Sequence, residues 1–244
     1  METIPLFQLS PSIDRGRAAR EFAETQRVQI RDFLAPEAAQ TIHRVLSRET
    51  PWGLAWQAGA DGPHGLRRQE VAALGPERSK ALMQKIAEAM HGRAYAFVYG
   101  QYQLLTAAVE RWGEHEALEL LMEHINDEPL MELVRTVTGI PQLRKADGQA
   151  TLYGPNHFLA LHDDSHVAEG WQIAYVMNFC AEDWRPDWGG YLLFYDENGD
   201  VIHGFKPRFN TLNMFKVGQA HNVSYVPPFA PVGRYAITGW FRDR

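Results

Sequence analysis

A histidine and an aspartate two positions apart are the residues of this chain best suited to bind a metal ion. His162 and Asp164 end the stretch TLYGPNHFLALHDD, which occupies residues 151–164. On a β-strand, the side chains of residues i and i+2 lie on the same face, so these two could bind one ion together. One imidazole and one carboxylate are two of the three ligands in a facial triad that suits iron(II). A site of this kind needs a second histidine from elsewhere in the chain.

His221 is the best candidate for that third ligand, because it begins an alternating run with room for several strands between it and Asp164. Further on, Arg234 opens the run RYAITGWF, in which residues 234, 236, 238 and 240 would share one face of a strand. An arginine buried on an otherwise apolar strand is costly without an anionic partner. A ligand carboxylate, gripped in bidentate fashion, would remove that cost.

Simpler interpretations compete with these assignments. The His162–Asp164 pair could be an ordinary surface pair, and Arg234 could form a structural ion pair. His166 has the parity of His162 and is a rival ligand, although the residues around it favour a loop. Tyr153, which precedes the pair, could be a core aromatic residue, since barrels bury many of them.

Other residues near the pair have weaker assignments. Asp163 should face away from the metal ligands, so a loop or substrate contact is the better interpretation for it. Tyr175 and Asn178 have opposite parity in the next expected strand, so at most one of them faces a pocket. Cys180, the only cysteine, is expected to be a buried apolar residue rather than a reactive thiol.

The second part of the chain, residues 147–244, is expected to be β-structure. Short β-branched and aromatic runs alternate there with Gly, Pro, Asn and Asp, a pattern typical of an all-β barrel or sandwich. The expected strands are residues 151–162, 172–179, 191–195, 210–215, 221–226 and 234–241.

The first part, residues 1–146, is expected to be mainly helical with a few strands. Apolar residues at helical spacing predict helices over residues 17–24, 36–48, 76–91, 114–125 and 128–137. Alternating runs predict strands over residues 27–30, 52–57 and 95–105, with a glycine-rich loop at residues 58–65. No repeat or linker separates the two parts, so residues 1–244 are expected to form one composite domain.

The composition excludes several classes of protein. The net charge of -6 and the pI near 5.9 argue against a nucleic-acid-binding surface. One cysteine excludes an internal disulfide, and the sequence shows neither a secretory signal nor the ~20-residue apolar run of a membrane span. We therefore expect a cytoplasmic protein with no nucleic-acid or membrane partner.

The order of these motifs resembles the Fe(II)/2-oxoglutarate-dependent dioxygenases, in particular their prolyl-hydroxylase-like branch. The run YGPNHFLALHDD is similar to that branch's approach to its His-x-Asp motif. WGGYL (residues 188–192) is similar to its Gly-Gly-x-Leu strand, and GRYAITGWF (residues 233–241) to its closing strand. The stretches IRDFLAPE and PLMELVRTVTG also resemble the helical region of predicted proline hydroxylases. The resemblance is tight over residues 151–241 and loose before them.

This resemblance implies a double-stranded β-helix core, the jelly-roll of cupin-like proteins, with an N-terminal layer of supporting helices. It implies that His162, Asp164 and His221 bind Fe(II) and are the catalytic metal ligands. Arg234 would bind the distal carboxylate of 2-oxoglutarate, and Tyr153 would donate its hydroxyl to the same group. The implied cofactors are Fe(II), 2-oxoglutarate as co-substrate and O2, with ascorbate as a candidate reductant.

The implied activity is hydroxylation of an unactivated C–H bond with release of succinate and CO2. A prolyl residue of a protein or peptide is the leading substrate, and a small molecule such as an amino acid or a secondary metabolite is the alternative. A non-catalytic 2-oxoglutarate sensor is the third possibility. Ala236 stands where many members of the branch have Ser or Thr, so the resemblance implies no secondary contact to 2-oxoglutarate there.

Overall fold

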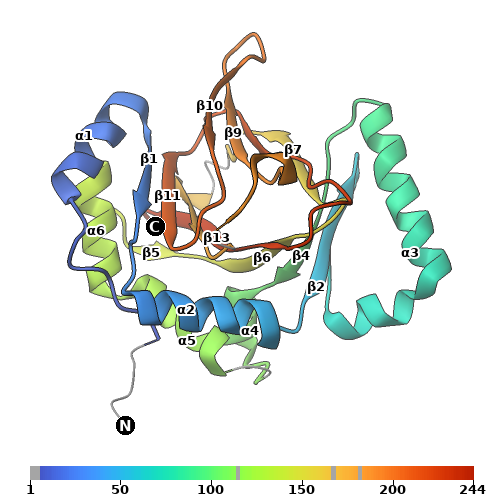
Figure 1. Ribbon diagram of the computed structural model, residues 1–244, viewed down its shortest axis with the longest axis horizontal. Helices are drawn as coiled ribbons and strands as arrows, with labels where there is room; N and C mark the ends of the chain where they lie inside the picture. Colours follow the sequence, from blue (N-terminus) through green and yellow to red (C-terminus); the bar gives the residue numbers. More distant parts are fainter. Residues whose placement is uncertain (1–5, 114–115, 166–168, 181–182) are drawn as a thin grey trace.

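The computed structural model describes residues 6–113, 116–165, 169–180 and 183–244. Antiparallel strands curl into a barrel, one group of helices lies along one side of it and beneath it, and a long helix stands on the opposite side (Figure 1). None of the helices in these ranges is long and apolar enough to cross a membrane.

Ten strands follow one another through the sheet in the order β1-β11-β8-β13-β6-β4-β7-β12-β9-β10. One layer consists of β1 (Arg27–Arg31), β11 (Thr211–Lys216), β8 (Trp171–Asn178), β13 (Arg234–Arg242), β6 (Gln149–Tyr153) and β4 (Ala96–Tyr102). The facing layer consists of β7 (Phe158–His162), β12 (His221–Val223), β9 (Leu192–Tyr195) and β10 (Val201–Phe205). The predicted helix-flanked double-stranded β-helix is confirmed.

Alternation along β13 divides its side chains between two cores. Ile237 and Phe241 pack toward the helices, whereas Ala236 and Trp240 pack inside the barrel against residues of the facing layer. This is the period of two expected for a strand buried on both faces. Arg234, at the start of β13, therefore points into the barrel, as the sequence predicts.

Helices cover the outer face of the first layer. They are α1 (Arg15–Thr25), α2 (Pro36–Arg44), α4 (Leu104–Glu110), α5 (Glu116–Asn126) and α6 (Glu128–Thr138), with a π-helical turn at Val45–Glu49 after α2. Local signals set several ends: the Asp14 side chain accepts from Arg17 N at the start of α1, Pro36 begins α2, and Gly139 in the left-handed region ends α6. The predicted helices that correspond to α1, α2, α5 and α6 are confirmed, except that residues 114–115 lie outside the described ranges, and α4 was not predicted.

Helix α3 (Arg68–His91) lies apart from the others and packs on β2 (Gly53–Ala58) and β4, with Ile86 buried between them. It is longer than the predicted residues 76–91 because two helical segments join at Gly75, whose φ of 68° only glycine adopts readily. The predicted loop at residues 58–65 was wrong. Residues Asp61–Leu66 form β3, which pairs with β2 as a hairpin turning at Gly59.

Other strands also differ from expectation, among them the expected strand 221–226, which ends at Val223. The expected single strand 151–162 is two strands, β6 and β7, because the Gly-Pro-Asn turn between them includes Asn156 at positive φ. The expected strand 95–105 ends at Tyr102, where α4 follows. Strand β10 was not predicted, and the short elements β5 (Lys145–Ala146) and Pro186–Trp188 complete the fold.

A largely buried ion pair joins β13 to Asp147, in the turn between β5 and β6. The Asp147 carboxylate accepts from Trp240 N (2.8 Å) and from Arg242 Nε (2.9 Å) and is also bonded to the end of the Arg242 guanidinium. Arg242 forms a second pair, at 3.3 Å, with the exposed Glu169. Asp147 thus ties the closing strand to the strand beside it.

We expect Asp147→Ala to lower the free energy of unfolding by about 2 kcal/mol, measured by urea denaturation. Removing one partner of a fully buried pair costs ~3–5 kcal/mol, and this pair retains some contact with water. The matched control is Glu169→Ala, which removes the exposed partner of the same Arg242 and should cost less than ~0.5 kcal/mol. Equal effects of the two substitutions would contradict a structural role for Asp147.

Candidate active site

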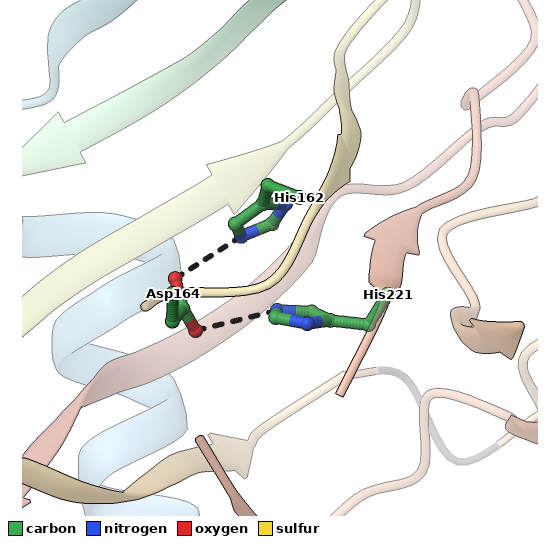
Figure 2. Close-up of side chains that lie close together, drawn as sticks. All are labelled: His162, Asp164 and His221. Atoms are coloured by element: carbon green, nitrogen blue, oxygen red, sulfur yellow. Dashed lines mark ion pairs between the residues drawn. The ribbon is translucent and has the colours of Figure 1, made fainter. Parts of the chain in front are cut away.

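His162, Asp164 and His221 come together inside the barrel (Figure 2). His162 ends β7 and His221 begins β12, and the two residues are directly paired in the antiparallel register. Asp164 lies between the rings, with its carboxylate oxygens 3.3 Å from His162 Nε2 and 3.4 Å from His221 Nε2. One ligand atom from each residue lies within 4.8 Å of the others, so a single ion could contact all three.

The reason given by the sequence for the His162–Asp164 pairing was wrong. Strand β7 ends at His162, and Asp164 follows it with a φ of 58°. The pair therefore does not share a face through strand alternation. A left-handed turn, which aspartate tolerates better than most residues, brings the carboxylate back toward the ring.

Backbone carbonyls hold both imidazoles in the same tautomer. His162 Nδ1 lies 2.9 Å from Ala160 O, and His221 Nδ1 lies 2.8 Å from Gln219 O. Because a carbonyl oxygen only accepts, Nδ1 must donate in each ring, and Nε2 of the neutral ring presents a lone pair. These are the two nitrogens that face the Asp164 carboxylate. When both rings are neutral, only acceptors converge at this point, so the arrangement calls for a cation, either a proton or a metal ion, among them.

The protonation states suit a metal ion in that place. Burial and the neighbouring His162 lower the pKa of His221 to about 4, which leaves this ring neutral at neutral pH. Burial alone would raise the pKa of Asp164, but the hydrogen bond from His162 and the two rings lower it below its usual value, so the carboxylate is ionised. Burial likewise opposes protonation of His162, but Asp164 raises the pKa of this ring. A bound metal would replace the proton that His162 shares with Asp164.

Arg234 is a buried cation without an anionic partner among the residues that the structure describes. The side chain is among the largest fully buried ones, at 2% exposure, and no described Asp or Glu forms an ion pair with it. Its Nε donates to Asn178 Oδ1 at 3.3 Å, whereas its Nη1 is buried with no hydrogen-bond partner. Burial lowers the pKa of the guanidinium. An unsatisfied charged donor in this position is the feature that a ligand carboxylate would complete.

Tyr153 lies directly across the β6–β13 ladder from Arg234. The guanidinium carbon lies 5.2 Å from the centre of the Tyr153 ring, a cation–π arrangement, and the ring also stacks on Tyr99 at 5.1 Å. The structure thus brings Tyr153 beside Arg234, and its contact with 2-oxoglutarate stays a prediction.

One cavity of about 590 Å³ contains both the three convergent ligands and Arg234. Its walls are largely aromatic, with Tyr95, Phe97 and Tyr99 on one side and the parallel Trp171–Trp240 stack, 4.0 Å between ring centres, on another. Gln57 and Pro63, from the β2–β3 hairpin, also line it. A pocket of this size and character accommodates a small dicarboxylate together with part of a substrate.

The described residues with weaker assignments lie at or near the same cavity. Of the two residues that sequence parity could not separate, Tyr175 lines the cavity, although it packs with the helix-facing core and its hydroxyl donates to Asp147 O at 2.7 Å. Asn178 does not line the cavity, but it accepts a hydrogen bond from Arg234. Asp163 is exposed at the cavity and its Oδ1 accepts from Ser165 N. Burial raises the pKa of the Cys180 thiol to about 12, as expected for an inert buried residue. His166, the rival ligand, lies outside the described residues.

We expect Asp164→Ala to weaken Mn(II) binding by at least ~100-fold, because loss of a direct ligand exceeds the ~10–100-fold cost of losing a residue that supports one. Mn(II) affinity is measured by titration with electron paramagnetic resonance detection. The matched control is Asp163→Ala, which removes the adjacent carboxylate and should change the affinity less than about twofold. Equal losses in the two variants would remove Asp164 from the metal site.

Comparison with known proteins relates this barrel to one superfamily. Residues 148–242 match the family model described as the 2OG-Fe(II) oxygenase superfamily. The comparison with curated proteins gave no match.

Solved structures resemble the whole chain at low sequence identity. A prolyl-4-hydroxylase from Pseudomonas putida is 16% identical with a TM-score of 0.55, covering 94% of this chain and 99% of its own. An oxidoreductase of the 2OG-Fe(II) oxygenase family from Burkholderia pseudomallei is 10% identical with a TM-score of 0.61, covering 98% and 94%. A prolyl hydroxylase from Trichoplax adhaerens, solved with a peptide fragment of the oxygen degradation domain of hypoxia inducible factor, is 16% identical with a TM-score of 0.59, covering 94% and 89%. Likeness at these identities is a likeness of fold.

Proposed function

We propose that this chain, an enzyme of the 2OG-Fe(II) oxygenase superfamily, hydroxylates a prolyl residue of a protein or peptide. The observation that carries the oxygenase chemistry is the convergence of three metal-ligand side chains and an unpartnered buried arginine in one cavity. The prolyl substrate is supported by the sequence resemblance and by the fold shared with prolyl hydroxylases from other organisms.

His162, Asp164 and His221 would hold Fe(II) through their Nε2 atoms and one carboxylate oxygen. Three protein ligands leave coordination positions open for other molecules. When bound, Fe(II) and 2-oxoglutarate supply the oxidative chemistry, in which O2 is consumed, succinate and CO2 are released and a C–H bond is hydroxylated. The chain itself contributes the fixed ring tautomers, the ionised carboxylate and the dry surroundings.

Arg234 would bind the distal carboxylate of 2-oxoglutarate through its unpartnered Nη1. Asn178 orients the guanidinium by accepting from its other side, at Nε. Tyr153 would limit the rotation of the guanidinium by packing its ring against it, and its hydroxyl is assigned to the same carboxylate. The buried cation then gains the anionic partner that the described residues do not provide.

Aromatic side chains would recognise the substrate. Tyr95 and the Trp171–Trp240 stack line the same cavity as the metal ligands, and Tyr95 lies 6.1 Å from the His162 ring, centre to centre. A pyrrolidine ring is compact and apolar, and it packs well on aromatic faces. These walls would also keep water from the reacting carbon.

Arg234→Met is expected to raise the 2-oxoglutarate requirement at least ~30-fold, which corresponds to ~2 kcal/mol, the lower end of what truncating one partner of a buried charge pair costs. Methionine fills most of the same volume, so the barrel should stay folded. Succinate formation is measured against 2-oxoglutarate concentration. Arg144→Met, which changes an exposed arginine, is the control and should leave the curve unchanged. An unchanged curve for Arg234→Met would exclude this residue from the co-substrate site.

The substrate class is tested by mass spectrometry on proline-containing peptides incubated with the enzyme, Fe(II), 2-oxoglutarate and ascorbate. We expect a gain of one oxygen atom on proline in step with succinate formation, and none when alanine replaces proline or Asp164→Ala replaces the enzyme. Succinate formed with free amino acids or other small molecules but with no peptide would overturn the prolyl assignment. It would leave the oxygenase chemistry intact.

A further inference from the structure

A second cavity lies away from the metal ligands, between the two ends of the sheet. Residues of helix α1 and strand β1 line one side of it, and residues of β10 and the segment that follows β10 line the other. Its volume is about 510 Å³. None of the residues that line it lines the cavity of the proposed active site. We refer to it as the β1–β10 groove.

Both strands beside the groove have an open edge. Among the strands that the structure describes, β1 pairs only with β11 and β10 pairs only with β9. Residues 201–204 of β10 are exposed, including the apolar side chains of Val201 (56%) and Ile202 (50%). An exposed edge with apolar side chains is a template for pairing with another extended chain.

Four cationic side chains line the groove from both walls. Arg17 and Arg31 belong to the α1–β1 wall, and Lys206 and Arg208 follow β10. None of them forms an ion pair with any residue in the described ranges, although other arginines of this chain do. The groove has two acidic lining residues, Asp14 and Glu21, and Asp14 is occupied in capping α1.

This local positive charge contrasts with the net charge of the protein, which is -6. Charged residues on edge strands can serve only to prevent unwanted pairing. Charges that only prevent pairing should disfavour every incoming strand. A groove lined by cations on both sides instead repels basic segments and attracts acidic ones. Charge and open edges together therefore specify one kind of partner.

We propose that the β1–β10 groove binds an acidic, extended segment of a partner protein, which adds as a strand along the open edge of β10. Backbone hydrogen bonds to β10 provide the alignment. Because Val201 and Ile202 are adjacent in β10, apolar side chains on one face of the segment contact one of the two, and its carboxylates meet the four cations. This proposal does not depend on the substrate of the oxygenase site.

The test measures binding by fluorescence anisotropy, with a fluorescein-labelled peptide of alternating valine and glutamate as the probe. We expect wild-type protein to bind the probe with an affinity that falls as salt is raised, because exposed ion pairs are screened. The variant Arg31→Glu/Arg208→Glu reverses one charge on each wall and should weaken binding by about tenfold or more. The matched control Arg78→Glu/Lys80→Glu reverses two exposed charges on α3, across the molecule, and should bind as wild type does.

Two modified probes separate strand pairing from simple charge attraction. Replacing glutamate by glutamine tests the charge, and methylating alternate backbone nitrogens of the original probe blocks strand pairing without changing charge. Both should bind at least about tenfold more weakly. In hydrogen exchange, the probe should slow exchange of β10 amides. The proposal would be overturned if wild-type protein did not bind the probe, or if both charge-reversal variants bound it equally weakly. It would also be overturned if the methylated probe bound as tightly as the original. Tighter binding of a single-stranded oligonucleotide than of the peptide would also overturn it.

Discussion

Three hydrogen-bond acceptors converge on one point inside the barrel, and the rest of the site depends on this arrangement. The Ala160 and Gln219 carbonyls fix the proton of each histidine on Nδ1, so both rings direct lone pairs at an ionised carboxylate. Such a cluster is unfavourable unless a cation lies within it. The fold holds it because the rings belong to paired strands whose backbone hydrogen bonds fix their positions. The ligands are therefore preorganised before any ion arrives.

Arg234 is the opposite case, a buried cation for which the described residues provide no anion. The barrel satisfies one side of the guanidinium with Asn178 and packs one of its faces on Tyr153, but one nitrogen is left without a partner. The two unsatisfied groups lie in the same cavity, one requiring a cation and the other an anion. A ligand that bridges a metal and a distal carboxylate site would satisfy both. This complementarity accounts for two features that stability alone would not select.

Local patterns in the sequence were sufficient to predict the strand interiors and the faces that they present. The period of two placed Arg234 inside the barrel, and the structure agrees, with Ile237 and Phe241 on the opposite face. Local patterns failed where the backbone leaves regular structure. The positive φ values of Asp164 and Asn156 set the ligand geometry and divide an expected strand, and hydrophobic periodicity does not report such values. Asn178 was left unassigned for a different reason, because its contact with Arg234 depends on the register in which β8 pairs with β13, a non-local property.

The direct pairing of His221 with His162 in the β7–β12 ladder has a consequence for how the barrel closes. Strand β12 has three residues, so few backbone bonds distinguish its correct alignment from one shifted by a single position. Such a shift would turn the His221 ring out of the barrel and present a neighbouring side chain in its place. A metal ion held by His162, Asp164 and His221 would bind only the aligned form and would add its binding free energy to that form alone. The ion would then stabilise the correct register of β12 in addition to its role in the chemistry.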